Sequence, residues 1–204
     1  MSDFTSTNYQ VIDSLLKGKT SGTVVYIEDR LYEGKQTIDK LYEFAESGGE
    51  VFISTNEISK PLLDTLGIKQ SYYYPSDIST TLQNERSFCL ADGRKASYND
   101  LHYPGVFWDL DSAQVTILGY FEAEGKKIPN FIRVEVGKGR FILHLEPVMF
   151  TNYFMLKRDN FNYGLTALKF ISSNNLYWYD GNFKTAHRSG SPLRVLLENA
   201  GLRE

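Results

Sequence analysis

A change of rhythm near the middle of the chain limits its fold more than any other feature. The first third alternates buried-strand patterns, "GTVVYIED" and "EVFIST", with helical spacing of apolar residues over 34–47. From Val106 to Glu146 the β signal dominates, and "VFWDL", "AQVTILGYFEAEG", "NFIRVEVG" and "RFILHLE" predict consecutive strands. Alternating strands and helices favour a doubly wound, mostly parallel sheet, whereas consecutive strands favour an antiparallel part.

We therefore expect a single α/β domain over residues 1–204, with that mostly parallel sheet as its core. The polar and aromatic segment from about residue 70 to 105 predicts a loop-rich insertion. Beyond the strands, a helix is expected from roughly Asp159 to Ser172, with Phe161, Leu165 and Leu168 as its inner stripe. Pro192 opens a further expected helix at the C-terminus.

Composition argues against several classes of function. The net charge is -3 and no basic stripe occurs, which argues against a nucleic-acid partner. Cys89 is the only cysteine, so a disulfide within the chain and a cysteine-based zinc site are both excluded. The N-terminus lacks the basic and apolar parts of a signal peptide. A cytosolic protein and a soluble piece of a longer membrane-anchored chain both fit, and the helical pattern at the C-terminal end favours the second.

Gly137-Lys138-Gly139-Arg140 brings glycines beside a lysine, as phosphate-binding loops do. A Walker loop needs different spacing and a helix after it, whereas a strand follows here. The segment therefore predicts a hairpin turn in which glycine adopts positive φ.

His144 and Glu146 are the candidate catalytic residues. Residues two apart in a strand share a face, so the imidazole and the carboxylate could serve one site as an oriented general base. A nucleophile in a strand-to-helix elbow is missing, since Cys89 lies in "RSFCLADG". The alternative interpretation is that His144 packs inside the sheet and Glu146 meets solvent or a helix N-terminus.

Glu146, Asn152, Asp159 and Asn160 are the candidate ligand-binding residues, because they follow the last core strand. Asn and Asp at such places also cap turns and helices. "NLYWYDGNF" gathers Tyr177, Trp178 and Tyr179, which are typical either of a half-buried core strand or of an exposed patch for sugar or protein.

No metal site is expected. His102, His144 and His187 lack partners at ligand spacing, and no H-E-x-x-H motif occurs. The acidic stretch "DLHYPGVFWDLD" supplies Asp100, Asp109 and Asp111, but it lacks the EF-hand pattern and is more typical of an acidic loop. No cofactor motif is present either.

Several segments carry a resemblance to known families. "FAESGGEVFIST" is similar to the helix, double glycine and strand of the class I glutamine amidotransferase-like fold, a flavodoxin-like arrangement. "VEVGKGRFILHLEPVMFTN", "DNFNYGLTALKFI", "LYWYD" and "SPLRVLLENAGLR", in this order, resemble the bacterial family called domain of unknown function 4350.

The resemblance implies a soluble α/β domain between hydrophobic segments, placed in the periplasm and anchored in the inner membrane. It also implies that "SPLRVLLENAGLR" leads into a membrane helix and that an edge of the domain is missing at the N-terminus. A protein partner follows, in a membrane complex linked to a MoxR-type AAA ATPase. Glutamine amidotransferases carry His-Pro-Glu after a late strand; His144-Leu145-Glu146 has similar spacing, but the required cysteine elbow is absent.

These observations favour a non-catalytic binding or scaffolding domain of a membrane-anchored bacterial protein, with no cofactor and no nucleic acid. Two alternatives stay open. One is a hydrolase that uses Glu146 with His144 or Asp109, and the other is a glycan-binding module built on Tyr177, Trp178 and Tyr179. A cytoplasmic location is the alternative to the periplasm.

Overall fold

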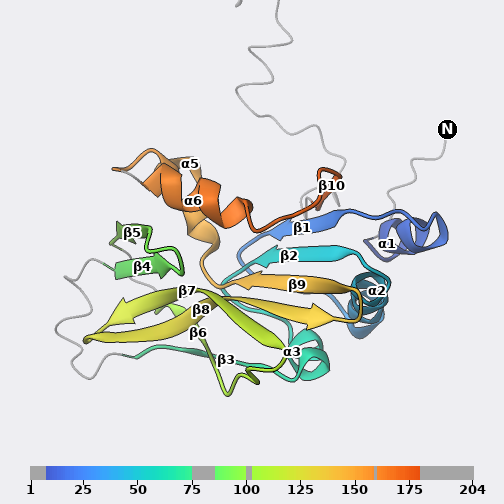
Figure 1. The fold of residues 1–204 in the computed structure, drawn as a ribbon, viewed down its shortest axis with the longest axis horizontal. Coiled ribbons are helices and arrows are strands. Elements are labelled where there is room, and N and C mark those ends of the chain that lie inside the picture. The colour runs from blue at the N-terminus through green and yellow to red at the C-terminus, as the bar shows by residue number, and fades with distance from the viewer. Residues whose placement is uncertain (1–7, 75–85, 100–102, 159, 180–204) are drawn as a thin grey trace, which may run out of the picture. The chain divides into compact units, whose positions relative to one another are not determined.

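The computed structural model of this protein describes residues 8–74, 86–99, 103–158 and 160–179 (Figure 1). All of them belong to one compact unit, Ser6–Tyr179. The strands are β1 Thr23–Ile27, β2 Glu50–Ser54, β3 Lys69–Tyr72, β4 Arg86–Leu90, β5 Lys95–Tyr98, β6 Gly105–Trp108, β7 Val115–Ala123, β8 Lys126–Val136, β9 Gly139–His144 and β10 Leu176–Tyr179. The helices are α1 Asn8–Lys17, α2 Lys35–Glu46, α3 Lys60–Leu66, the 3-10 helix η1 Pro147–Phe150, α5 Asn152–Met155 and α6 Asn160–Leu168.

Eight strands form one mixed sheet in the order β10-β1-β2-β9-β8-β7-β4-β5. The pairs β10–β1, β1–β2 and β2–β9 are parallel, and every other pair in this sheet is antiparallel. Strands β3 and β6 pair with each other in a separate two-stranded sheet. The main sheet curls into a half-barrel, as the long strands β7 and β8 show in Figure 1.

The expected doubly wound, flavodoxin-like and amidotransferase-like sheet is therefore wrong. A doubly wound sheet grows by successive strand-helix-strand crossovers, which deliver each new strand parallel to the last. Here that growth stops after α3, because β3 leaves the main sheet and the next strands enter it antiparallel. The second parallel neighbour of β2, besides β1, is β9, which arrives through the β8–β9 hairpin and not through a helix.

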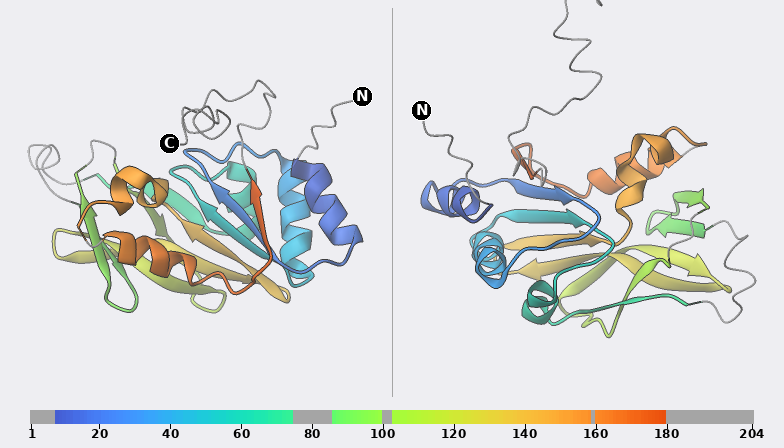
Figure 2. Two further views of the ribbon diagram at one scale, coloured as in Figure 1. Left: turned by 90° about the horizontal axis from the view of Figure 1, so that it is seen from above. Right: turned by 180° about the vertical axis from the view of Figure 1, so that it is seen from behind.

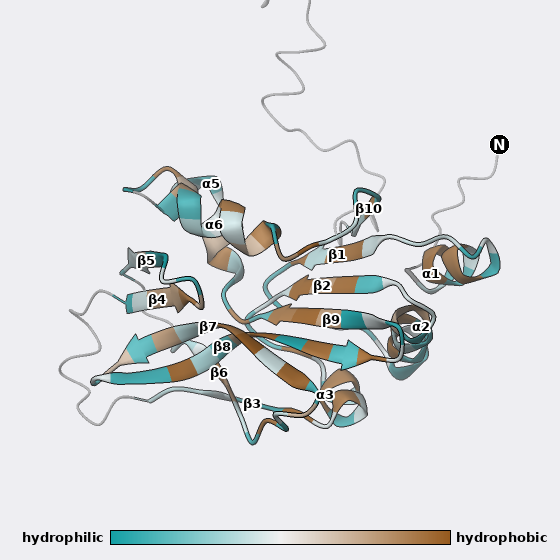
Figure 3. Ribbon diagram, viewed as in Figure 1, coloured by the Kyte–Doolittle hydropathy of each residue, from teal (hydrophilic) through white to brown (hydrophobic). Residues whose placement is uncertain are grey.

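Strands β1, β2 and β9 of the parallel half are buried on both faces, which explains their unbroken apolar runs. In β1, Val24 and Tyr26 face the core beneath α1, α2 and α3, whereas Val25 faces the core formed with η1, α5 and α6. Strands β2 and β9 alternate in the same way. Figure 2 shows α1 and α2 side by side along this part of the sheet, and Figure 3 shows the concentration of hydrophobic residues in β2 and β9.

The Gly137-Lys138-Gly139-Arg140 hairpin is confirmed. Strands β8 and β9 pair antiparallel around it, and Gly137 has φ 56°. Gly139 is needed for a different reason, because a Cβ there would overlap the carbonyl oxygens of Gly49 and Ala45. The turn thus packs directly onto the end of α2.

The predicted inner stripe of the helix after the sheet is wrong for Phe161 and Leu165, whereas Leu168 is partly buried and packs against the core. In α6, Phe161 is 51% exposed and Leu165 is 41% exposed, while Tyr163 and Ala167 are fully buried. Both stripes have helical spacing, so periodicity alone could not choose between them. The buried face is the one that brings the Tyr163 hydroxyl to the end of β9.

The segment expected to be an insertion contributes to the main sheet, since β4 and β5 both lie between residues 70 and 105 and extend its antiparallel half. The helix expected from Pro192 lies outside the described residues. Among the described helices, none has both the length and the hydrophobicity needed to cross a bilayer.

Candidate binding surface

His144 ends β9 in the protein interior, with 0% of its surface exposed. Its Nδ1 lies 2.9 Å from the Ser54 hydroxyl and its Nε2 lies 3.3 Å from the Tyr163 hydroxyl. Burial lowers the pKa of His144 to about 3, so the ring is neutral at ordinary pH. Both ring nitrogens thus have hydroxyl partners, and neither is directed to Glu146.

Glu146 follows β9 and is 4% exposed. Its Oε1 accepts a hydrogen bond from the Tyr98 hydroxyl, which comes from β5. Burial, and then the neighbouring charge of Glu146, raise the pKa of Tyr163. The strand spacing does bring His144 and Glu146 into one buried polar region, but through Tyr163 and not through a bond between them.

For His144 to act as a general base, a substrate would have to reach its fully buried imidazole ring. Cys89 is also buried, and its thiol donates to the carbonyl of Leu90. Asp109, the other candidate partner for Glu146, is an exposed residue that pairs with Lys69 at 2.5 Å. The buried hydrogen bonds of His144 with Ser54 and Tyr163 instead form a network that joins β2, β9 and α6.

The remaining candidate ligand-binding residues, Asn152, Asp159 and Asn160, do not lie together in one site. Asn160 is 2% exposed and bridges to the backbone of Ser97 in both directions, at 3.3 Å each. Asn152 is exposed at the first turn of α5, where the Thr151 side chain provides the cap. Asp159 lies outside the described residues.

The aromatic residues of β10 do not form one platform. Tyr177 and Tyr179 pack against the core beneath α1, and the Tyr179 ring lies 4.8 Å from that of Tyr26. Trp178, between them in the strand, is 60% exposed. Alternation along a strand places it on the opposite face.

Within the described part of the chain, no group of three or more His, Cys, Asp or Glu side chains is arranged to hold a metal ion. Asp111 accepts hydrogen bonds in its own turn, from the backbone N–H groups of Ala113 and Val115. Asp100, His102 and His187 lie outside the described residues.

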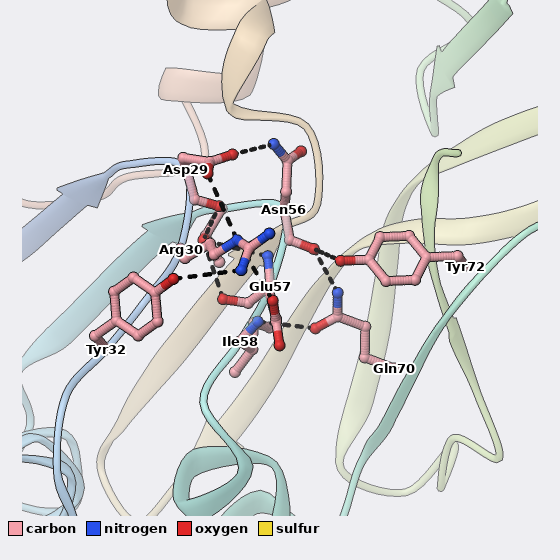
Figure 4. A network of polar contacts seen from close by, with 9 residues as sticks. Asp29, Arg30, Tyr32, Asn56, Glu57, Ile58, Gln70 and Tyr72 are labelled. Carbon is pink, nitrogen blue, oxygen red and sulfur yellow. Dashed lines mark hydrogen bonds and ion pairs between the residues drawn. The ribbon is translucent and has the colours of Figure 1, made fainter. Parts of the chain in front are cut away.

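A different polar cluster lies at the carboxyl ends of β1 and β2, the edge where α/β proteins place ligand sites. The loops that follow these two strands are tied to each other (Figure 4). The Asp29 carbonyl accepts from the Asn56 N–H at 2.9 Å, and the Asp29 carboxylate accepts from the Asn56 side-chain amide at 2.8 Å. Arg30 and Glu57 form an isolated parallel bridge, with Nε and Oε2 3.6 Å apart.

Strand β3 ties the second loop from the other side. Gln70 donates to the Asn56 carbonyl at 2.6 Å and accepts from the Ile58 N–H at 2.9 Å. The Tyr72 hydroxyl donates to the same carbonyl at 3.5 Å (Figure 4). The loop after β2 is thus held between β1 and β3 by side chains that satisfy its backbone.

The outer part of this cluster is open to solvent. Tyr32 is 80% exposed and its hydroxyl accepts from Arg30 at 3.4 Å. The side chains of Asp29, Arg30 and Glu57 are all more than half exposed. We name this cluster the tied-loop surface, and it consists of Asp29, Arg30, Tyr32, Asn56, Glu57, Gln70 and Tyr72.

No sequence motif marks the tied-loop surface. The available signal was position, because "EDR" and "TNE" directly follow two predicted buried strands. The contribution of Gln70 and Tyr72 had no such signal, since β3 lies within the segment expected to be loop-rich.

Solved structures with TM-scores above 0.5 share this fold at low sequence identity. The mmIFT52 N-terminal domain is 12% identical with a TM-score of 0.52, and the match covers 78% of each chain. The exo-β-1,4-mannosidase Op5Man5 from Opitutaceae bacterium strain TAV5 is 13% identical with a TM-score of 0.51, and the match covers 75% of this chain and 26% of the mannosidase. A β-galactosidase, Gan42B from G. stearothermophilus, has a TM-score of 0.42 at 17% identity; the match covers 60% of this chain and only 18% of Gan42B.

No curated protein matches the sequence. A family model does, over residues 4–168, and this range contains every strand except β10. It also contains the tied-loop surface and the buried network around His144. The chain belongs to the family described as domain of unknown function 4350.

Proposed function

We propose that this protein is a non-catalytic binding or scaffolding domain that presents the tied-loop surface to a protein partner. The observation that carries the proposal is the combination of rigidity and exposure at the carboxyl ends of β1 and β2. The backbone of both loops is fixed by Asp29, Asn56 and Gln70, while Tyr32 is 80% exposed beside charged side chains. Loops that are already ordered lose little conformational entropy on binding, and exposed Tyr and Arg side chains are common anchors of protein interfaces.

The interior network supports binding over catalysis. A general base has to reach its proton within hydrogen-bond distance, and the candidate base, His144, is fully buried with a pKa lowered to about 3. The hydroxyls within reach of His144 belong to Ser54 and Tyr163, and both residues are 0% exposed. No observation favours a hydrolase over a binding domain.

The proposed setting is the periplasmic side of a bacterial inner membrane, with the domain anchored through segments that flank it. Family membership and the resemblance of "SPLRVLLENAGLR" to the stretch before a membrane helix support this setting. The partner is proposed to belong to a membrane complex linked to a MoxR-type AAA ATPase. Protease added to intact spheroplasts checks the side, because a periplasmic domain is digested without lysis.

Site-specific photo-crosslinking tests the surface itself. A photoreactive phenylalanine analogue replaces Tyr32 in the full-length protein, expressed in its own bacterium, and adducts are identified by mass spectrometry. Tyr9 is the matched control, since it is a tyrosine on α1 that is 39% exposed. We expect position 32 to form one dominant adduct with a protein of the membrane fraction. Equal labelling at positions 32 and 9 would contradict a specific surface.

A further inference from the structure

Strand β3 is an edge strand, because it pairs with β6 on one side and these two strands form a sheet of their own. In an antiparallel pair, every second residue directs its backbone N–H and C=O groups toward the partner strand. The Tyr73 N–H donates to the Pro104 carbonyl at 2.9 Å, in register with the ladder. The backbone groups of Ser71 therefore point to β6, whereas those of Gln70 and Tyr72 point outward.

The outward backbone groups are open to a new partner. Among the described residues, no acceptor bonds to the N–H of Gln70 or Tyr72, and no donor bonds to the Gln70 carbonyl. The hydrogen bonds of Gln70 run through its side chain instead, to Asn56 and Ile58. The Tyr72 carbonyl accepts a long bond of 3.4 Å from the Ser71 hydroxyl. A row of such groups is a template for another strand.

Three common protections of an edge strand are not in place at β3. Proteins often guard an edge with a proline, a β-bulge or a lysine that extends over it. Strand β3 has the sequence KQSY, without proline, and its register with β6 is continuous. Its lysine, Lys69, turns back over β6, where its amine lies 4.7 Å from the centre of the Trp108 ring and pairs with Asp109. The outer edge is thus left accessible.

Strand β5 shows how the same chain closes an edge. The Asn160 side chain accepts from the Ser97 N–H and donates to the Ser97 carbonyl, both at 3.3 Å. At β3 the corresponding amide belongs to Gln70, but it is directed to the loop at Asn56 and Ile58 and not to its own edge (Figure 4). The side chain therefore holds the tied-loop surface while its backbone stays available.

We propose that the outer edge of β3 receives an extended segment of the protein partner, which adds a strand beside Gln70 and Tyr72. The proposal rests on the proposed function, since both residues belong to the tied-loop surface. Main-chain hydrogen bonds supply the affinity in this mode of binding. A four-residue strand cannot by itself supply the roughly 1,200–2,000 Å² of a specific interface. The edge therefore extends the tied-loop surface and does not serve to join two copies of this chain.

Photo-crosslinking from β3 itself tests the proposal in the full-length protein, expressed in its own bacterium. A photoreactive phenylalanine analogue replaces Ser71, which is exposed and lies between the two outward-facing residues. Glu135 is the matched control, since it is exposed on β8, a strand that has neighbours on both sides. We expect position 71 to label the same protein as position 32, through one contiguous segment, and position 135 to leave that protein unlabelled.

Two changes at Tyr72 isolate the backbone hydrogen bond. Tyr72→Pro and Tyr72→Ala both remove the phenol ring, but only proline also removes the outward N–H. Proline is tolerated where the N–H of an edge strand faces solvent, so the two variants should have similar Tm values. The adduct yield at position 71 should be about tenfold lower with proline than with alanine, because one backbone hydrogen bond to the partner is lost.

Failure of this proposal can be separated from failure of the proposed function. Adducts from position 32 without adducts from position 71 would overturn the strand addition and leave the tied-loop surface as the binding site. The lack of adducts from both positions would overturn both. Equal yields from the two Tyr72 variants, or adducts that join position 71 to a second copy of this chain, would also overturn the strand addition.

Discussion

The hydroxyl of Ser54 lies 2.9 Å from Nδ1 of His144, and the two residues are directly paired where β2 and β9 run parallel. They are 90 residues apart in the chain and both are completely buried. On the other side of the ring, Tyr163 completes the contacts of Nε2. The pair therefore joins three segments of the fold through one neutral imidazole.

This burial predicts acid sensitivity. The pKa of His144 is lowered from 6.5 to about 3 in the folded protein. Between these two values the unfolded chain binds a proton at this position and the folded protein does not, so protonation favours unfolding. The free energy of unfolding should fall by about 1.4 kcal/mol for each pH unit below 6.5, which chemical denaturation between pH 7 and pH 4 measures.

His144→Phe is the control for the acid effect. Phenylalanine cannot take up a proton, so the variant should lose stability at pH 7 but lose less as the pH falls. The difference in slope between the two proteins isolates the histidine from the carboxylates, which titrate in both. Parallel pH profiles would show that His144 is not the group responsible.

Glu50 supports the attachment of β10. It is 4% exposed and accepts hydrogen bonds from the Thr23 hydroxyl at 2.8 Å and from the N–H of Ser172 at 2.9 Å, while Arg140 Nε lies 3.3 Å away. Glu50→Ala leaves these buried donors unpaired and should cost about 3 kcal/mol of unfolding free energy. Urea denaturation measures the loss.

Two matched changes define the cause of that loss. Glu50→Gln keeps an acceptor of the same shape and should retain most of the stability. Glu43→Ala removes an exposed partner of Lys40 on α2 and should cost less than about 1 kcal/mol. A loss at Glu43 equal to that at Glu50 would contradict the assignment.

The two hairpin glycines should respond differently to alanine. At Gly139 the added Cβ would overlap the carbonyl oxygens of Gly49 and Ala45, so the β8–β9 hairpin would have to separate from α2. We expect a loss of about 3 kcal/mol or failure to fold. At Gly125 nothing lies within 4 Å, and only the positive φ of 73° is penalised, by about 1–2 kcal/mol. Thermal unfolding of both variants distinguishes the clash from the backbone effect.

The two faces of α6 should differ sharply in sensitivity. Tyr163→Ala opens a cavity in the core against β9 and removes the partner of His144 Nε2, at a cost of about 3–5 kcal/mol. Phe161→Ala, on the face that is 51% exposed, should change stability by less than about 0.5 kcal/mol. Equal losses would mean that Phe161 is covered in solution.

Local features of the fold were predictable because they depend on short segments. Pro61 lies in the first turn of α3, and Gly67 ends that helix with φ 65°, the left-handed conformation of a glycine cap. Gly48 has φ 116° after α2, and Gly137 turns the β8–β9 hairpin. In each case a few neighbouring residues set the backbone conformation.

The arrangement of strands was not predictable in the same way. The rhythm before β3 has the signature of a doubly wound sheet, but nothing local indicates that β3 will pair with β6 or that β9 will lie beside β2. For α6, the stripe with Phe161 and Leu165 is more hydrophobic than a buried face that includes Asn160 and Tyr163. Hydrogen bonds to Ser97 and His144 offset the burial of those polar groups.

Sequence alone determined where the chain turns, which strands are apolar on both faces, and that an activated cysteine elbow is missing, because spacing and backbone preference act over a few residues. Tertiary structure decided that His144 and Glu146 are buried and that Asp29 and Asn56 meet at an exposed edge. Burial and proximity arise from pairing between segments far apart in the chain. The pairing of β9 with β2 and the contact of Tyr163 with His144 therefore placed the buried network, and the parallel pairing of β1 with β2 placed the exposed surface.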